Sequence, residues 1–173
     1  MKSNMRVLFT EDQIRQRAKE IGQQIMKDYE GKEVILVGTL RGAVVWMADL
    51  MKEITMEDLK IDFIVASSYS GTNTTGVVKI SKDLTEDVTG KHVIIVEDIV
   101  DTGITLNRVV DYIMAKGAES VEICSLLNKP SRRIVDINPK YCGFDVENLF
   151  VIGYGLDCEQ KYRNLPYVAY IDA

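Results

Sequence analysis

Apolar residues near the start of the chain recur at the spacing of a single helix face. The period of three to four residues, with polar residues between, is typical of an amphipathic helix. The apolar residues with this spacing are Ile14, Ala18, Ile21, Ile25 and Tyr29. Thr10 and Gln13 precede them in the arrangement of a capping box, which favours a helix start at this point. The pattern therefore predicts a helix that ends before Gly31 and has a structural role.

Runs of consecutive apolar residues predict strands that are buried on both faces. The clearest run is residues 93–96, where β-branched residues follow one another without interruption. Further strands are expected at residues 34–37, 61–66, 78–84, 121–127, 149–152 and 167–171. Helical spacing returns at residues 44–51 and again after Gly103, whereas residues 134–144 are expected to be irregular. This order of strands and helices is that of an α/β protein.

Length and composition narrow the class of protein. The 173 residues fit one domain, and we see no internal repeat, low-complexity tract or linker. The net charge of −5 argues against a broad nucleic-acid-binding face, but not against a small anion whose charge a metal ion compensates. The three cysteines form no CxxC pair, so reduced thiols in a cytosolic protein are expected. Neither a signal peptide nor a membrane-spanning run is expected.

The residues that follow the 93–96 strand carry the most specific chemistry. Three carboxylates lead into a small-residue loop and a helix start: Glu97, Asp98, Asp101, Thr102, Gly103, Ile104 and Thr105. Ligands of parallel sheets bind beyond the carboxyl ends of the strands, and the N–H groups at a helix start bind anions. The loop therefore predicts a phosphate site, while the carboxylates should face sugar hydroxyls, a metal ion or a proton. A phosphorylated sugar satisfies all three; the alternative is a solvated acidic corner.

Other segments offer candidate chemistry beside a plainer interpretation. Residues 38–43 are a small-residue loop with one arginine, which fits a second anion site and a plain turn equally well. Residues 67–77 are polar and without an apolar period, as in a lid or a slack hairpin tip. Lys129 ends a strand at the same edge as the acids, either as a functional group or as surface charge. His92 is expected to be solvated, and no local motif supports a histidine-assisted nucleophile.

Residues 93–105 resemble the phosphoribosyl-diphosphate-binding motif of type I phosphoribosyltransferases. Among these, the chain looks most like the hypoxanthine-guanine phosphoribosyltransferases, and the resemblance covers nearly the whole chain. It implies that Glu97 and Asp98 face the ribose hydroxyls and a metal ion, that Asp101 is the acid–base residue, and that residues 102–105 bind the 5′-phosphate. Ile104 stands where some members have a charged or polar residue. The departure costs little, because that position mainly offers its backbone N–H.

The resemblance also assigns the pyrophosphate and purine sides. Leu40, Arg41 and Gly42 look like the family's pyrophosphate loop, which often contains a non-proline cis peptide, here Leu40–Arg41. The remaining implied roles are the flexible loop for Ser68 and Tyr69, the purine's exocyclic oxygen for Lys129, base stacking for Phe150, the purine edge for the Val151 backbone, a second metal ion for Asp157 and pyrophosphate for Arg163. Cys158 stands where an aromatic residue is common, which leaves the packing behind this region open.

Fold and reaction follow from the resemblance as expectations. The fold is α/β, with a central, mostly parallel, twisted sheet flanked by helices. The whole chain, 1–173, forms one domain, whose small hood is built from the N-terminal segment and roughly residues 130–173. The reaction is transfer of 5-phosphoribosyl from phosphoribosyl diphosphate to hypoxanthine or guanine, which gives IMP or GMP and pyrophosphate. The expected cofactor is Mg²⁺, near Glu97, Asp98 and Asp157. The enzyme is expected to act in purine salvage in the cytoplasm, as a homodimer or homotetramer. Neither a nucleic-acid partner nor a membrane partner is expected.

Three alternatives remain open at this stage. A phosphoacceptor receiver domain also carries carboxylates at strand ends and a Lys-Pro like Lys129-Pro130, but its acidic pair follows the first strand, and here residues 34–37 run into Gly38 and Thr39. An RNA-binding regulator with the same fold is disfavoured by the acidic balance and by Asp101. A related enzyme that prefers xanthine or a pyrimidine would differ only in the base pocket.

Overall fold

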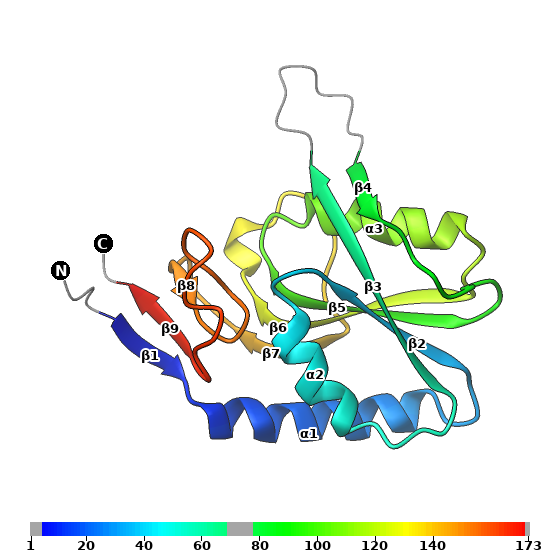
Figure 1. Cartoon of the computed structure of the whole chain (residues 1–173), viewed down its shortest axis with the longest axis horizontal. Coiled ribbons are helices and arrows are strands. Elements are labelled where there is room, and N and C mark those ends of the chain that lie inside the picture. The colour runs from blue at the N-terminus through cyan, green and yellow to red at the C-terminus, as the bar shows by residue number, and fades with distance from the viewer. Residues whose placement is uncertain (1–4, 69–77, 172–173) are drawn as a thin grey trace.

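Two sheets and three α-helices make up the part of the chain that the computed structural model describes, residues 5–68 and 78–171 (Figure 1). The helices are α1 (Glu11–Asp28), α2 (Val44–Lys52) and α3 (Ile104–Ala115), with a 3-10 turn at Pro130–Arg132. The strands are β1 (Met5–Phe9), β2 (Val34–Thr39), β3 (Leu59–Ser68), β4 (Val78–Lys82), β5 (His92–Val100), β6 (Ser120–Asn128), β7 (Tyr141–Asp145), β8 (Val151–Ile152) and β9 (Val168–Ile171).

The large sheet has six strands in the order β4-β3-β2-β5-β6-β7. Strands β3, β2, β5, β6 and β7 pair in parallel, and only β4 at one edge is antiparallel. This confirms the expected α/β class with a mostly parallel sheet. Because the strands are parallel, the carboxyl ends of β2, β5 and β6 lie at one edge, which is where such sheets bind ligands.

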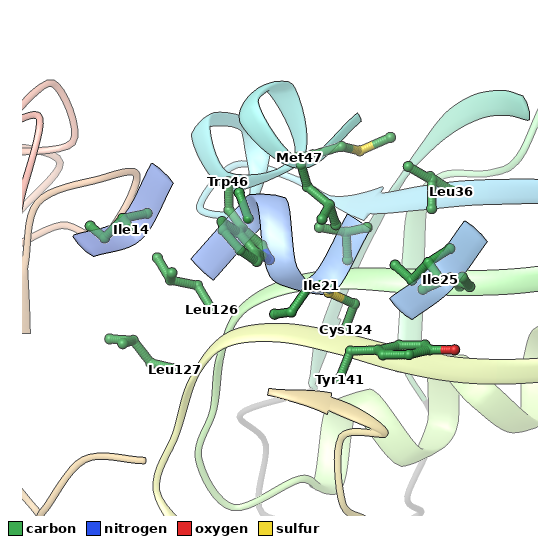
Figure 2. Close-up of a cluster of buried hydrophobic side chains, with 14 of the residues drawn as sticks. Ile14, Ile21, Ile25, Leu36, Trp46, Met47, Cys124, Leu126, Leu127 and Tyr141 are labelled. Carbon is green, nitrogen blue, oxygen red and sulfur yellow. The ribbon is translucent and has the colours of Figure 1, made fainter. Parts of the chain in front are cut away.

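Helices cover both faces of this sheet. On one face α1 and α2 pack against one set of alternating strand residues, including Leu36, Ile94 and Leu126. On the other face α3 packs against the set between them, including Ile35, Val37 and Ile95. Figure 2 shows Trp46 and Met47 of α2 gathered with residues of α1 and the sheet in the first layer. Each fully buried aliphatic side chain in these layers stabilises the fold by about 1.5–3 kcal/mol.

The predicted start of α1 is confirmed in detail. The Thr10 hydroxyl accepts a hydrogen bond from the Gln13 backbone N–H at 3.3 Å, and the Gln13 side chain accepts one from the Thr10 N–H at 2.9 Å. This capping box satisfies two helix-start donors. The helix ends at Asp28, and the buried residues Ile14, Ala18, Ile21 and Ile25 lie on its inner face.

Three segments differ from the sequence prediction. Residues 141–145 form β7, although the surrounding stretch looked irregular; the strand is defined by its parallel pairing with β6 rather than by its own pattern. Strand β5 does not end at Val96 but continues through Glu97 and Asp98 to Val100, because β6 pairs with it as far as Asn128. His92, which was expected to be solvated, is half-buried: its Nδ1 lies 2.7 Å from the Ser120 hydroxyl, and its ring packs at a tilt on Tyr29.

A small antiparallel sheet joins the two ends of the described chain, with strand order β1-β9-β8. Strand β1, which the sequence pattern did not predict, pairs with β9 from Met5↔Ile171 to Phe9↔Val168. The loop that follows β8 is tied to the main body, because the Tyr154 hydroxyl donates a hydrogen bond to Asp49 on α2. Within residues 5–68 and 78–171, none of the helices has both the length and the apolar character needed to cross a membrane.

Candidate active site

Loops from three parallel strands and from the region after β8 meet at the carboxyl edge of the large sheet. A cleft of about 260 Å³ lies there. Its lining comes from separate parts of the chain: Thr39, Leu40, Gly42, Ala66, Glu97, Asp98, Thr105, Leu106, Val109, Asp157 and Arg163. A second hollow, of about 160 Å³, adjoins it along residues 99–106 and shares Glu97, Thr105 and Leu106 with it. The edge that the sequence singled out is therefore a continuous concave site.

The loop between β5 and α3 presents unpaired backbone N–H groups to the smaller hollow. Gly103 forms the N-cap of α3 in the left-handed conformation, with φ +81°, which a residue without Cβ adopts readily. Asn107 N–H already bonds the Gly103 carbonyl at 2.8 Å. Within the described residues, the N–H groups of Thr105 and Leu106 bond to no protein acceptor. Such a helix start is a ready anion site.

The acidic pair lies between the two hollows. Glu97 accepts a hydrogen bond from the Thr39 hydroxyl at 2.7 Å and one from the Asp98 backbone N–H at 3.1 Å. Loss of water around Glu97 and the adjacent Asp98 charge raise the pKa of Glu97 well above its ordinary value. One Asp98 oxygen accepts a hydrogen bond from the Ile99 N–H at 2.7 Å, which fixes the direction of the carboxylate.

The loop after β2 packs directly against this pair. The Leu40–Arg41 peptide bond is cis, as the resemblance suggested. A Cβ added to Gly42 would lie 1.7 Å from an Asp98 carboxylate oxygen, so only glycine leaves room there. Gly155, with φ +97°, closes on the same loop from the other side, because a Cβ at Gly155 would lie 2.0 Å from the Gly42 carbonyl oxygen. Segments 39–43, 97–98 and 155 thus form one packed unit.

Arg163 and Asp157 stand together at the rim of the cleft. Their side chains form an ion pair of 2.8 Å, and Arg163 also donates a hydrogen bond to the Gly155 carbonyl at 2.7 Å. These contacts hold one cation and one carboxylate of the loop after β8 over the same cleft as Glu97 and Asp98. The site therefore offers positive charge opposite the acidic pair.

Asp101 lines the smaller hollow and is partly exposed. One of its carboxylate oxygens accepts a hydrogen bond from Arg132 Nε at 3.0 Å. Its backbone carbonyl accepts another from Arg133 at 2.7 Å, and Arg133 also bonds the Asn128 side chain at the end of β6. We did not single out either arginine from the sequence. Their position just after Lys129-Pro130, beyond a strand that ends at the same edge, was the signal available.

Lys129 is buried, and its ammonium donates a hydrogen bond of 2.7 Å to the Leu149 carbonyl. Removal from water lowers the pKa of Lys129; the charge of Asp101 opposes that shift. The bonded carbonyl directly precedes Phe150, whose side chain is 56% exposed, and the buried Val151. The structure thus brings together the three residues that the resemblance assigned to the purine side.

The two expected residues of the flexible loop lie on either side of a boundary of the described chain. Ser68 is the last residue of β3, where its backbone pairs with Val78 of β4. Tyr69 and most of the expected lid at residues 67–77 lie outside the described residues.

Comparison with known proteins gives one consistent family. The family model for the phosphoribosyl transferase domain matches residues 8–159. A hypoxanthine-guanine phosphoribosyltransferase of Streptococcus pneumoniae (strain R6) is 47% identical over 164 residues, covering 94% of this chain and 91% of the relative. A hypoxanthine phosphoribosyltransferase of Salmonella typhimurium is 48% identical over 171 residues, covering 97% and 96%.

Solved structures show the same similarity. A hypoxanthine phosphoribosyltransferase from Staphylococcus aureus superposes with a TM-score of 0.92 at 45% identity, covering 96% of this chain and 91% of that one. The corresponding enzyme of Trypanosoma cruzi superposes with a TM-score of 0.92 at 32% identity, covering 99% and 93%. A receiver domain is therefore the wrong interpretation of the acidic strand ends.

Proposed function

Because this chain belongs to the phosphoribosyltransferase family, we propose that it transfers 5-phosphoribosyl from phosphoribosyl diphosphate to hypoxanthine or guanine, giving IMP or GMP and pyrophosphate. The observation that carries the proposal is the single edge at which free helix-start amides, a carboxylate pair, a rim arginine and a buried lysine converge. The names of the similar relatives favour an enzyme over an RNA-binding regulator of the same fold.

The free amides of Thr105 and Leu106 support a site for the 5′-phosphate, since the positive end of α3 favours negative charge there. Thr102 lines the same hollow and can add a hydroxyl donor. Glu97 and Asp98 line the larger cleft beside this loop. Their carboxylates would accept hydrogen bonds from the ribose hydroxyls. The ribose would thereby be held in one orientation for reaction at C1.

The pyrophosphate end would lie between residues 40–42 and Arg163. The carboxylates there fit Mg²⁺, which usually binds through one or two carboxylates, waters and substrate phosphates rather than through a complete protein cage. The described residues contain no group of three or more His, Cys, Asp or Glu side chains arranged to hold a metal. When bound near Glu97, Asp98 or Asp157, Mg²⁺ would neutralise charge on the departing pyrophosphate.

Asp101 would act as the acid–base residue by exchanging a proton with purine N7. In this structure its carboxylate is half-exposed and bonded to Arg132, so it is open to an incoming base. A general acid or base contributes ~10²–10⁴-fold to the rate. The positive charge that develops on the ribose carbon as its bond to pyrophosphate breaks would be neutralised when the purine attacks.

Lys129 would select oxopurines. Its ammonium, fixed near Phe150 and Val151, would donate to the 6-oxo group, whereas adenine would set an amino group against a buried donor. We propose that the small β1-β9-β8 sheet and the loop after β8 are the hood over the base, with Phe150 as the stacking face. The exposed Phe150 ring supports this role.

The assay that tests the function supplies each of hypoxanthine, guanine, xanthine, adenine and uracil with phosphoribosyl diphosphate and Mg²⁺, and follows pyrophosphate release. We expect turnover with hypoxanthine or guanine and little with adenine. Turnover with uracil alone, or with none of the bases, would contradict the proposal. Light scattering of the same sample would test the expected homodimer or homotetramer, and a monomer would contradict it.

A further inference from the structure

The two arginines proposed for pyrophosphate come from distant parts of the chain but share one neutral acceptor. Arg41 lies in the loop after β2, and Arg163 lies in the loop before β9. The Gln160 carboxamide oxygen accepts a hydrogen bond from Arg41 at 3.2 Å and another from Arg163 at 3.0 Å. Two nitrogens that donate to one oxygen are close neighbours, so two like charges are held facing each other.

Gln160 is itself fixed by the loop that carries it. Its backbone N–H donates a hydrogen bond of 2.8 Å to Asp157, the same carboxylate that pairs with Arg163. The residue adopts a left-handed backbone conformation, with φ 64°. Asp157, Gln160 and Arg163 are therefore spaced three residues apart in the sequence and are connected by hydrogen bonds and an ion pair. Within the described part of the chain, Gln160 is the only hydrogen-bond acceptor of Arg41.

This arrangement leaves most of the Arg41 donors and some of the Arg163 donors available. A guanidinium has five N–H donors. Arg41 gives one nitrogen to Gln160, whereas Arg163 also contacts the Gly155 carbonyl and Asp157. Because the acceptor is an amide, it orders the two side chains without adding a second negative charge to that of Asp157, which already pairs with Arg163. A carboxylate in the same place would bind them more tightly and would neutralise part of the charge meant for an anion.

We propose that Gln160 is a positioning residue for the pyrophosphate group, which braces Arg41 and Arg163 in the orientation that receives it. The inference rests on the proposed function and adds to it a residue that orders the pyrophosphate end of the site. Ordering a long side chain before a ligand arrives removes part of the entropy cost of binding. Gln160 remains in place while the free guanidinium donors bind phosphate oxygens.

The test compares Gln160→Asn and Gln160→Glu with the unaltered protein. Asparagine keeps the amide, tolerates the left-handed backbone and falls short of the arginines by one methylene. The matched control is Glu159→Asp, which shortens the neighbouring residue by the same amount at φ 52°; in the described residues the Glu159 side chain makes no hydrogen bond or ion pair. We expect the Kd for magnesium pyrophosphate and the KM for phosphoribosyl diphosphate to rise about three- to tenfold in Gln160→Asn.

Gln160→Glu should weaken pyrophosphate binding as well, while Glu159→Asp should leave it unchanged. The KM for hypoxanthine should stay within about twofold in all variants, which separates positioning from a general loss of structure. Unchanged pyrophosphate affinity in Gln160→Asn would overturn the proposed positioning role of Gln160. Tighter binding would also overturn it, since Gln160 would then compete with pyrophosphate for the arginines. An unaltered protein that binds pyrophosphate but turns over no purine would overturn the proposed function instead.

Discussion

Replacement of Gly42 by alanine tests most directly the contact between the loop proposed to bind pyrophosphate and Asp98, the acid proposed to bind the ribose. The added Cβ would lie 1.7 Å from an Asp98 carboxylate oxygen and 2.6 Å from the carboxylate carbon. The other Asp98 oxygen is held by the Ile99 N–H at 2.7 Å, so rotation of the carboxylate away from the methyl group breaks that hydrogen bond. Either the loop or the acid must move by about 1.7 Å to restore an ordinary contact, which is more than the misplacement of about 1 Å that already impairs catalysis.

The size of the effect follows from this displacement. Overpacking of a close-packed region costs about 1–3 kcal/mol of unfolding free energy. Misplacement of a substrate-positioning group by about 1 Å lowers the rate about 10²-fold. We therefore expect Gly42→Ala to lower kcat/KM for phosphoribosyl diphosphate about 10²-fold, which corresponds to roughly 2.7 kcal/mol of lost transition-state stabilisation.

Steady-state kinetics and urea unfolding measure the two effects. Gly90→Ala is the control for the kinetics, because no heavy atom lies within 4 Å of the added Cβ and the residue is remote from the cleft. Its φ of +70° strains an alanine, so this variant should lose stability but keep its kcat/KM. In an Asp98→Ala background, the additional loss of stability caused by Gly42→Ala should shrink, since the clashing atom is gone. Full kcat/KM in Gly42→Ala would refute the reasoning.

Three further predictions concern single side chains. Asp101→Asn should lower kcat ~10²–10⁴-fold with little change in the KM for phosphoribosyl diphosphate, and an unaltered kcat would remove its acid–base role. Lys129→Met should lower kcat/KM for hypoxanthine by about 10–100-fold with little change in the urea midpoint; retained oxopurine activity would contradict it. Burial disfavours the charged form of Asp62, but hydrogen bonds from the Glu86, Phe63 and Thr85 N–H groups and the charge of Lys82 outweigh it, so its pKa is lowered. The stability that the Asp62 carboxylate adds is present above its unfolded pKa near 4 and is lost as the pH falls through its folded pKa. Asp62→Asn should therefore flatten the decline of the unfolding free energy below about pH 5. An equally steep decline in the variant would exclude this assignment.

Local patterns predicted the elements that bury a regular set of side chains. The capping box at Thr10 and the apolar stripe of α1 depend on neighbours a few residues away, and both appear as expected. The β-branched run at residues 93–96 predicted a central strand because a strand buried on both faces needs no alternation. The position of Asp101 and Gly103 beyond that strand followed from the same argument.

The parts that the sequence did not reveal depend on distant partners. Strand β1 forms because it pairs with β9, and strand β7 forms because it pairs with β6. Arg132 bonds Asp101 and Gln160 bonds Arg41 across large separations in sequence, and no local spacing reports either contact. The roles given to the site residues remain predictions that the variants above will test.

Pairing of the first strand with the last has a consequence during biosynthesis. Strand β1 leaves the ribosome well before its partner β9, which begins only at Val168, roughly 160 residues later. At translation rates of about 5–20 residues per second, the opening segment waits about ten to thirty seconds for its neighbour. The large sheet can assemble meanwhile on the emerging chain, whereas the small sheet forms only after β9 has been made, so catalytic competence should appear abruptly at that point.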